Sequence, residues 1–175
     1  RGVTRKYPHT PGIDAVGEVI VSNSSDFKSG EKIIVTGYDL GMNTFGGFGQ
    51  YISISANWAI PLPKKLSEAE AMSIGTAGLT AGLCVRKLLM NDFTPDSGNV
   101  LVTGASGGVG SVAVMVLSKL GFKVVALTGK KDQADHLESL GASSVIMRSE
   151  MEEQGKPLQR GIYQGGVDTV GGNIL

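Results

Sequence analysis

The sequence contains little of what several classes of protein and site require. There is one cysteine, Cys84, and there are two histidines, His9 and His136, among 175 residues. A disulfide framework needs paired cysteines, and a structural zinc site needs about four thiolate or imidazole ligands. We therefore expect neither a disulfide-stabilised fold nor a cysteine-built metal site, and one unpaired cysteine is typical of a reducing, cytoplasmic compartment.

Net charge and long apolar runs are also missing. Sixteen basic residues balance sixteen acidic ones, so the formal net charge is zero. Without an excess of positive charge, the chain has no field that would attract nucleic acid or an anionic membrane surface. The longest apolar segments are much shorter than the roughly 18 residues that a membrane span requires. We expect a soluble protein with neither a nucleic-acid partner nor a membrane partner.

The two ends of the sequence lead to a further expectation. The chain begins at Arg1 without a methionine, and it ends at Leu175 directly after a segment with the composition of a β-strand. We expect it to be the middle section of a longer polypeptide.

Glycine, by contrast, is abundant, and it separates short β-prone segments in the first half of the chain. There are 26 glycines, about twice the usual share of roughly 7%. Between residues 12 and 58, the β-prone segments 15–21, 32–35 and 51–54 alternate with turns rich in Gly, Asn, Ser and Asp. This half of the chain is predicted to be all-β.

A helical region and a junction follow. Ser67 and Glu70 have the spacing of a capping box, and the Ala-rich stretch beyond them continues at helical spacing to Leu89. One or two helices are predicted here. Residues 91–98 collect Asn, Asp, Pro, Ser and Gly, which is typical of a turn between domains.

After this junction the hydrophobic periodicity alternates between strand and helix, which is typical of a parallel α/β sheet. The predicted strands are 99–103, 123–127, 144–147 and 166–170, and the predicted helices are 109–120 and 133–140. We accordingly predict a first domain at 1–93, which includes the connecting helices, and a second domain at 94–175.

A glycine-rich loop lies between the first strand and the first helix of the second domain. Residues 104–110 read Gly-Ala-Ser-Gly-Gly-Val-Gly. In the register of a dinucleotide-binding fingerprint, Ala105 takes the first position, Gly107 lets the backbone approach a pyrophosphate, and Gly110 allows close packing of helix on strand.

The pyrophosphate would then rest on amides at the helix N-terminus, those of Gly108 and Val109, where the helix dipole also favours negative charge. The predicted phosphate contacts are Ser106, Gly107, Gly108, Val109 and Gly110. The alternative is a glycine-rich turn from strand to helix that binds no ligand.

The end of the second strand bears on which coenzyme binds. In an NAD site, an acidic residue about 20 positions after the glycines contacts the ribose hydroxyls. Here the chain reads Thr128-Gly129-Lys130-Lys131, and no carboxylate precedes Asp132. A hydroxyl and two ammonium groups suit the 2′-phosphate of NADPH. The alternative is that both lysines are simply solvated, although cations at the start of the next helix oppose its dipole.

An ordered series of motifs now points to a family. The motifs are Pro11-Gly12-Ile13-Asp14, Gly46-Gly47-Phe48, Gly75 to Ala81, and Gly104 to Gly110. Together the motifs resemble the quinone oxidoreductase branch of the medium-chain dehydrogenases/reductases, and within it the subgroup of acrylyl-CoA reductases and quinone oxidoreductases. The resemblance implies part of a GroES-like substrate domain, part of a Rossmann-type doubly wound parallel sheet, and an active-site cleft between the two. We also expect a homodimer.

The resemblance further implies a reaction. Members of this branch transfer hydride from NADPH to an activated C=C bond, as in an acrylyl-CoA-like enoyl thioester, or to a quinone. Zinc-dependent members of the superfamily carry a His-Glu pair after the Pro-Gly, whereas this chain has Ile13-Asp14. We therefore expect a zinc-independent enzyme, with His9 in a loop and His136 on a helix surface.

Two further residues are candidates for lining the cleft. Thr80 lies on the helix that leads into the second domain, and Asn43 lies in a glycine-rich loop. Thr and Asn are also common as caps and turn residues, which is the alternative for each. No catalytic acid is nominated.

Other functions stay open at this point. Residues 103–110 also fit the TGxxxGxG pattern of short-chain dehydrogenases, but none of the four tyrosines is followed by a lysine four positions later. A non-catalytic NADPH-binding protein is a second alternative. Half of a Rossmann sheet exposes a strand edge and apolar faces, so we expect the chain alone to be unstable and inactive.

Overall fold

The computed structural model describes residue 4 and the ranges 7–151 and 161–172. The chain divides into two compact units, residues 1–76 and residues 77–175. This division comes earlier than the predicted junction at 93/94, because Ala81 and Val85 are buried in the core of the second unit. The functional domain boundary at 93/94 stays a prediction.

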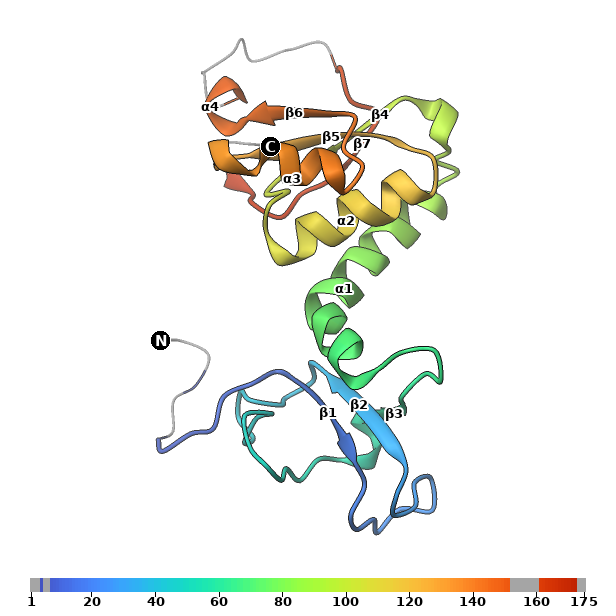
Figure 1. The fold of residues 1–175 in the computed structure, drawn as a ribbon, viewed down its shortest axis with the longest axis vertical. Helices are drawn as coiled ribbons and strands as arrows, with labels where there is room; N and C mark the ends of the chain where they lie inside the picture. The colour runs from blue at the N-terminus through green and yellow to red at the C-terminus, as the bar shows by residue number, and fades with distance from the viewer. Residues whose placement is uncertain (1–3, 5–6, 152–160, 173–175) are drawn as a thin grey trace. The chain divides into compact units, whose positions relative to one another are not determined.

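The first unit is built on a three-stranded antiparallel sheet in the order β1-β2-β3 (Figure 1). Its strands are β1 (Asp14–Glu18), β2 (Lys32–Thr36) and β3 (Ala59–Pro61), and a 3-10 turn, η1 (Ala56–Trp58), leads into β3. The prediction of an all-β half is therefore confirmed in kind, and β2 lies where the sequence predicted it.

The third predicted strand, 51–54, is wrong. Tyr51 to Ile54 form no strand, and the sheet is completed instead by β3, which pairs Ala59 with Val35 and Ile60 with Ile34. Strand propensity describes how well a side chain fits a pleated surface, and it produces a strand only where a neighbouring strand supplies hydrogen bonds. The first predicted segment, 15–21, likewise ends as a strand at Glu18.

Helix α1 (Glu68–Leu89) begins with the predicted capping box. The Ser67 N–H donates to Glu70 Oε2 at 2.8 Å, and the Glu70 N–H donates to Ser67 Oγ at 3.3 Å. The Ser67 hydroxyl also donates to Glu70 Oε2 at 2.8 Å. The pKa of the Glu70 carboxyl lies below its usual value because it accepts hydrogen bonds from the Ser67 backbone first and from the Ser67 hydroxyl second. Gly75, at φ 46° and ψ −155°, interrupts the helix, so both helical segments that the sequence allowed are present.

The second unit contains a four-stranded parallel sheet in the order β6-β5-β4-β7. Its strands are β4 (Asn99–Val102), β5 (Lys123–Thr128), β6 (Ser144–Met147) and β7 (Gly165–Val167). Its further helical segments are η2 (Pro95–Ser97), α2 (Gly108–Lys119), η3 (Lys131–Gln133), α3 (Ala134–Ser139) and α4 (Arg148–Met151). The chain runs outward from β4 to β6 and then returns to pair β7 with β4, so the strand order reverses beside β4. A parallel α/β sheet is therefore confirmed.

The structure corrects the predicted ends of several elements, beginning with β4, which ends at Val102 and not at residue 103. The last strand was predicted at 166–170, but β7 stops at Val167 because the Asp168 carboxylate turns back to accept the Gly171 N–H at 3.0 Å. Strand β5 extends one residue further than predicted, to Thr128. The helix predicted at 133–140 begins as the 3-10 turn η3 and becomes α-helical only at Ala134.

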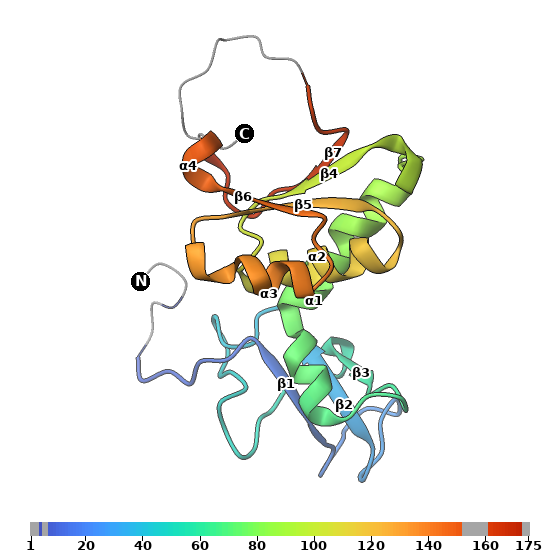
Figure 2. The same ribbon diagram turned by 45° about the horizontal axis from the view of Figure 1, so that its top comes forward.

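The core of the second unit lies between the sheet and its helices, and α2 and α3 lie on the same face of the sheet in Figures 1 and 2. Apolar side chains from both layers are fully buried, among them Val100, Val102, Leu117, Val124 and Leu137. This packing fixes the carboxyl ends of the parallel strands, where the predicted phosphate loop begins. Among the described helices, none is both long and apolar enough to cross a lipid bilayer.

Candidate functional site

The predicted phosphate loop connects the end of β4 to the first turn of α2. Gly107 precedes the helix with extended backbone angles, φ −85° and ψ 172°, and as a glycine it supplies no side-chain acceptor. The Ser111 N–H donates to the Gly107 carbonyl at 2.9 Å, which opens the helical hydrogen-bond ladder. The N–H groups of Gly108, Val109 and Gly110 come before this first hydrogen bond of the helix, at its amino end. Such a helix start binds anions through backbone N–H groups and the helix dipole.

Glycine is required in this loop because the backbone of α2 lies directly against the backbone of residues 104 and 105, which leaves no room for a side chain. A Cβ on Gly110 would lie 2.7 Å from the Ala105 Cα and still closer to the Gly104 carbonyl oxygen. Gly104 itself has a φ of +59°, in the left-handed region that favours glycine. Gly110 therefore allows α2 to approach the end of β4, which is the role that the fingerprint assigns to it.

Two of the predicted site residues, Ser106 and Thr128, contact one another. Their hydroxyl oxygens lie 2.9 Å apart, and Thr128 Oγ1 also accepts the Lys130 N–H at 3.1 Å. The Ala105 N–H donates to the Leu127 carbonyl at 3.0 Å. The phosphate loop is thus joined to the end of β5. Only 2% of Thr128 is exposed, so its hydroxyl points toward Ser106 and the backbone of Lys130 rather than into solvent.

The predicted cations lie at the exposed end of β5. Lys130 and Lys131 are both exposed where η3 begins. Arg148, the first residue of α4, lies beside them, because a Cβ on Gly129 would be 3.7 Å from the Arg148 Cδ. Sequence reasoning missed Arg148, although a signal was present: it directly follows a predicted strand. Since Thr128 pairs with Met147, the residues that follow these two strands are neighbours.

The two candidates for lining a cleft are placed in different units. Asn43 Nδ2 donates to Asp39 Oδ1 at 2.7 Å, so the Asn43 side chain takes the turn role that was its alternative. Thr80 is exposed on α1, three residues after Ala77, whose Cβ lies 3.3 Å from the Cβ position of Gly108. A role for either residue in coenzyme binding stays a prediction.

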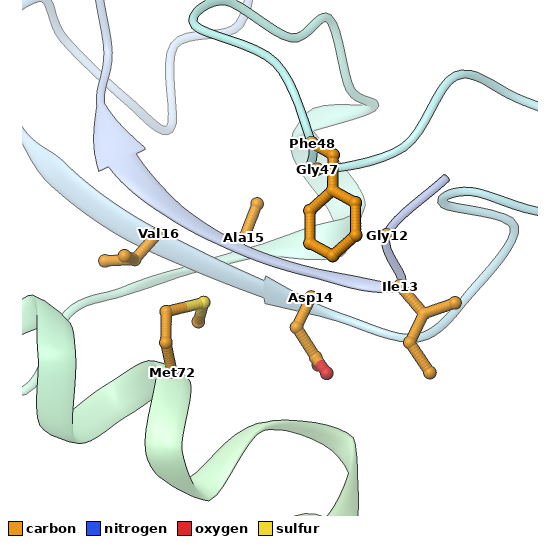
Figure 3. A pocket seen from close by; sticks show the side chains of 8 residues that line it. All are labelled: Gly12, Ile13, Asp14, Ala15, Val16, Gly47, Phe48 and Met72. Atoms are coloured by element: carbon orange, nitrogen blue, oxygen red, sulfur yellow. The ribbon is translucent and has the colours of Figure 1, made fainter. Parts of the chain in front are cut away.

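The first unit has a pocket of about 650 Å³ between β1 and α1 (Figure 3). The side chain of Met72 rises from α1 toward β1, and the Phe48 ring approaches β1 from another segment of the unit. The remaining lining residues are Gly12, Ile13, Asp14, Ala15, Val16 and Gly47. Asp14 supplies the one ionisable side chain of this lining, and its carboxylate accepts the Thr76 hydroxyl at 2.8 Å.

This pocket owes its shape to two glycine segments that cross. The Gly46 N–H donates to the Thr10 carbonyl at 2.7 Å, and the Phe48 N–H donates to the Pro11 carbonyl at 3.0 Å. A Cβ on Gly12 would lie only 2.8 Å from the Gly47 nitrogen. The motifs Pro11-Gly12 and Gly46-Gly47-Phe48, which are far apart in sequence, therefore form one structure that holds the Phe48 ring at the pocket.

The described residues gather no group of three His, Cys, Asp or Glu side chains that could hold a metal ion. His9 lies in a loop, where its Nε2 is 2.8 Å from the Gly41 carbonyl oxygen and its ring stacks on Phe45. His136 is exposed on α3. Both histidines thus lie where the sequence predicted, while zinc independence itself stays a prediction.

Comparisons with known proteins agree with this geometry. The family model of the alcohol dehydrogenase GroES-like domain matches residues 1–64. The chain is 47% identical over 175 residues to the acrylyl-CoA reductase AcuI of Ruegeria pomeroyi, which covers 99% of this chain and 53% of that protein. It thus spans about half the length of the curated relatives that it matches.

Two solved structures are also similar. The crystal structure of YhdH from Escherichia coli K-12 with bound NADPH has a TM-score of 0.96 and 41% identity, covering 99% of this chain and 54% of that one. The structure of YhfP from Bacillus subtilis with NAD bound has a TM-score of 0.93 and 47% identity, covering 99% of this chain and 53% of that one.

The β-rich first unit, the parallel second unit and the glycine loop between β4 and α2 are arranged as in these similar structures. The resemblance to the medium-chain dehydrogenases/reductases is therefore confirmed. It is a resemblance to the quinone oxidoreductase branch, in the subgroup that includes the acrylyl-CoA reductases. The expected architecture, part of a GroES-like domain followed by part of a Rossmann-type sheet, is confirmed.

Replacing Gly110 by alanine tests the close approach of α2 to β4. The added methyl group overlaps the Gly104 carbonyl, so we expect Gly110→Ala to lower the free energy of unfolding by about 1 to 3 kcal/mol. Gly82→Ala is the matched control: Gly82 is exposed on α1 with no atom within 4 Å of its Cβ position, and there alanine should stabilise the protein by about 0.4 to 1 kcal/mol. Urea unfolding measures the free energy of unfolding of both variants. Equal changes in the two variants would contradict the close approach of α2 to β4 at Gly110.

Proposed function

We propose that this protein is a zinc-independent, NADPH-dependent reductase that delivers hydride to an activated C=C bond, as in an acrylyl-CoA-like thioester, or to a quinone. The observation that carries the proposal is the combination of helix-start amides at Gly108 to Gly110 with a cationic strand end one strand away. The name of the Ruegeria pomeroyi relative and the NADPH bound to the Escherichia coli structure support it.

The coenzyme pyrophosphate is proposed to lie on the amino end of α2. There the amides of Gly108 and Val109 contact phosphate oxygens, Gly107 lets the backbone approach them, and Ser106 offers a hydroxyl from the loop. The Thr128 hydroxyl then acts by orienting Ser106, because it is buried in contact with Ser106 and with the Lys130 amide.

The adenosine 2′-phosphate is proposed to lie among Lys130, Lys131 and Arg148. The side-chain carbons of Arg148 pass beside Gly129, and both lysines are exposed at the end of β5. Charge-assisted hydrogen bonds from guanidinium and ammonium groups are the strongest that a phosphate can accept. NADPH is therefore preferred over NADH in this proposal, even though the Bacillus subtilis structure contains NAD.

The chain's part in the reaction is to bind and orient. When bound, the nicotinamide supplies the hydride, which an electron-poor carbon accepts. In zinc-dependent relatives, a histidine ligand follows the Pro-Gly motif, but here that position is the apolar residue Ile13. The reaction then depends on hydrogen-bond donors near the acceptor rather than on a Lewis acid.

The acceptor is proposed to use the pocket of the first unit. Its walls, including Ile13, Val16, Phe48 and Met72, are apolar, which suits the hydrocarbon part of an enoyl thioester or the ring of a quinone. The homodimer and the cytoplasmic location stay predictions, which sedimentation analysis and cell fractionation would test.

Turnover distinguishes the proposed enzyme from its alternatives. NADPH oxidation by the purified full-length protein is followed with acrylyl-CoA, with a quinone and with a ketone as acceptors, before and after treatment with a metal chelator. We expect reduction of the thioester or the quinone, with no loss after chelation. Tight NADPH binding without oxidation by any acceptor would favour a non-catalytic binding protein, and reduction of the ketone alone would favour a carbonyl reductase.

Replacing Lys130 and Lys131 together by alanine tests the choice of coenzyme. Because only NADPH carries the 2′-phosphate, we expect its dissociation constant to rise by roughly 10- to 100-fold while that of NADH changes little. Fluorescence titration measures both constants. Lys64→Ala with Lys65→Ala is the matched control, since these adjacent lysines are also exposed but belong to the first unit. An equal loss of affinity for both coenzymes would refute the assignment.

A bulkier side chain in the pocket tests the acceptor site. Met72→Trp should fill part of the pocket and raise the KM for the acceptor by roughly tenfold or more, while the dissociation constant of NADPH stays unchanged. Met90→Trp is the control, because Met90 follows the same helix but is 65% exposed outside the pocket. Unchanged acceptor kinetics in Met72→Trp would place the acceptor elsewhere.

A further inference from the structure

The loop that follows β7 makes a set of contacts that the coenzyme proposal does not use. Asp168 accepts a hydrogen bond from the Thr103 hydroxyl, and it also accepts the N–H groups of Val170 and Gly171 at 3.3 Å and 3.0 Å. The pKa of the Asp168 carboxyl lies below its usual value, mainly because of the hydrogen bond from Thr103 and also because of those from Gly171 and Val170. The carboxylate therefore gathers three donors from two loops that lie 65 residues apart in the sequence.

Thr103 and Thr169 reinforce this contact in both directions. The Thr169 N–H donates to Thr103 Oγ1 at 2.9 Å, and the Thr169 hydroxyl donates to the Thr103 carbonyl at 2.8 Å. Thr103 is 3% exposed, so its hydroxyl is oriented by these partners. The Thr103 hydroxyl therefore donates to the Asp168 carboxylate and at the same time accepts the Thr169 N–H.

Thr103 immediately precedes Gly104, and the same loop packs on Gly104. A Cβ on Gly104 would overlap the Thr169 hydroxyl and lie 3.0 Å from Val170 Cγ2. On its other side, the Gly104 carbonyl touches the position where Gly110 would carry a Cβ. Gly104 is therefore held between the loop after β7 and the first turn of α2.

From these contacts we infer that Asp168 is a positioning residue for coenzyme binding, acting through Thr103 and Gly104 on the helix-start amides. This inference rests on the proposed function, because it assumes that the pyrophosphate lies at those amides. In this arrangement Asp168 acts through the Thr103 hydroxyl, which donates to its carboxylate, and needs no contact of its own with the coenzyme. Its loss moves the backbone that contacts the pyrophosphate, which NADPH and NADH share, and leaves the site of the 2′-phosphate unchanged.

The test compares Asp168→Asn, Thr103→Val and Thr103→Ser by fluorescence titration with both coenzymes. We expect Asp168→Asn and Thr103→Val each to raise the two dissociation constants by about tenfold, with the preference for NADPH retained. Thr103→Ser keeps the hydroxyl and should stay within about twofold of the wild type, and the double variant should lose little more than either single one. Asp96→Asn removes an exposed acidic charge elsewhere in the second unit and should change nothing.

Three results would overturn the inference. The first is wild-type affinity in Asp168→Asn, and the second is an effect of Asp168→Asn on NADPH alone. The third is a loss of affinity in Thr103→Ser equal to that in Thr103→Val, because the effect would then not depend on the hydroxyl that donates to Asp168. If Asp168→Asn does not fold, the two Thr103 variants decide the question. A wild-type protein that binds neither coenzyme would refute the proposed function itself, whereas the three results above leave it intact.

Discussion

The structure of the candidate site depends on the contact of one backbone with another, where the first turn of α2 approaches the end of β4. Gly110 makes this possible, because any side chain there would overlap the Gly104 carbonyl. The approach aims the amides of the helix start beyond the carboxyl edge of the sheet. It lies where the strand order reverses, between β5 on one side and β7 on the other, which is where parallel α/β sheets bind ligands.

Polar contacts hold the phosphate loop to both neighbouring strands. Toward β5, the hydroxyls of Ser106 and Thr128 meet at 2.9 Å, and toward β7 the Thr103 hydroxyl meets the Asp168 carboxylate. Both contacts join a residue of the loop region to the end of the adjacent strand. A loop fixed in this way is preorganised, so a bound pyrophosphate would order little backbone on arrival.

The first unit also contains a close approach of two backbone segments at glycines, and here it shapes a pocket. Gly12 and Gly47 let two distant segments cross in direct backbone contact, and the crossing holds the Phe48 ring at the pocket. The Asp14 carboxylate accepts the Thr76 hydroxyl, and its Oδ2 would lie 2.9 Å from a Cβ on Gly75. The glycines of three of the motifs, Gly12, Gly47 and Gly110, are thus places where two backbone segments approach closely, whereas Gly75 of the fourth motif lies against a side chain.

The sequence alone determined the family resemblance, the alternation of strands and helices in the second unit, and the glycine loop, because each depends on local periodicity or on glycine at fixed spacing. Only the tertiary structure decided that β3 rather than Tyr51 to Ile54 completes the first sheet, since strand pairing depends on a partner elsewhere in the chain. It likewise placed Arg148 beside Gly129 and Asp168 against Thr103. Those contacts join residues 19 and 65 positions apart, and such distances in the chain become short only when parallel strands bring their carboxyl ends to one edge.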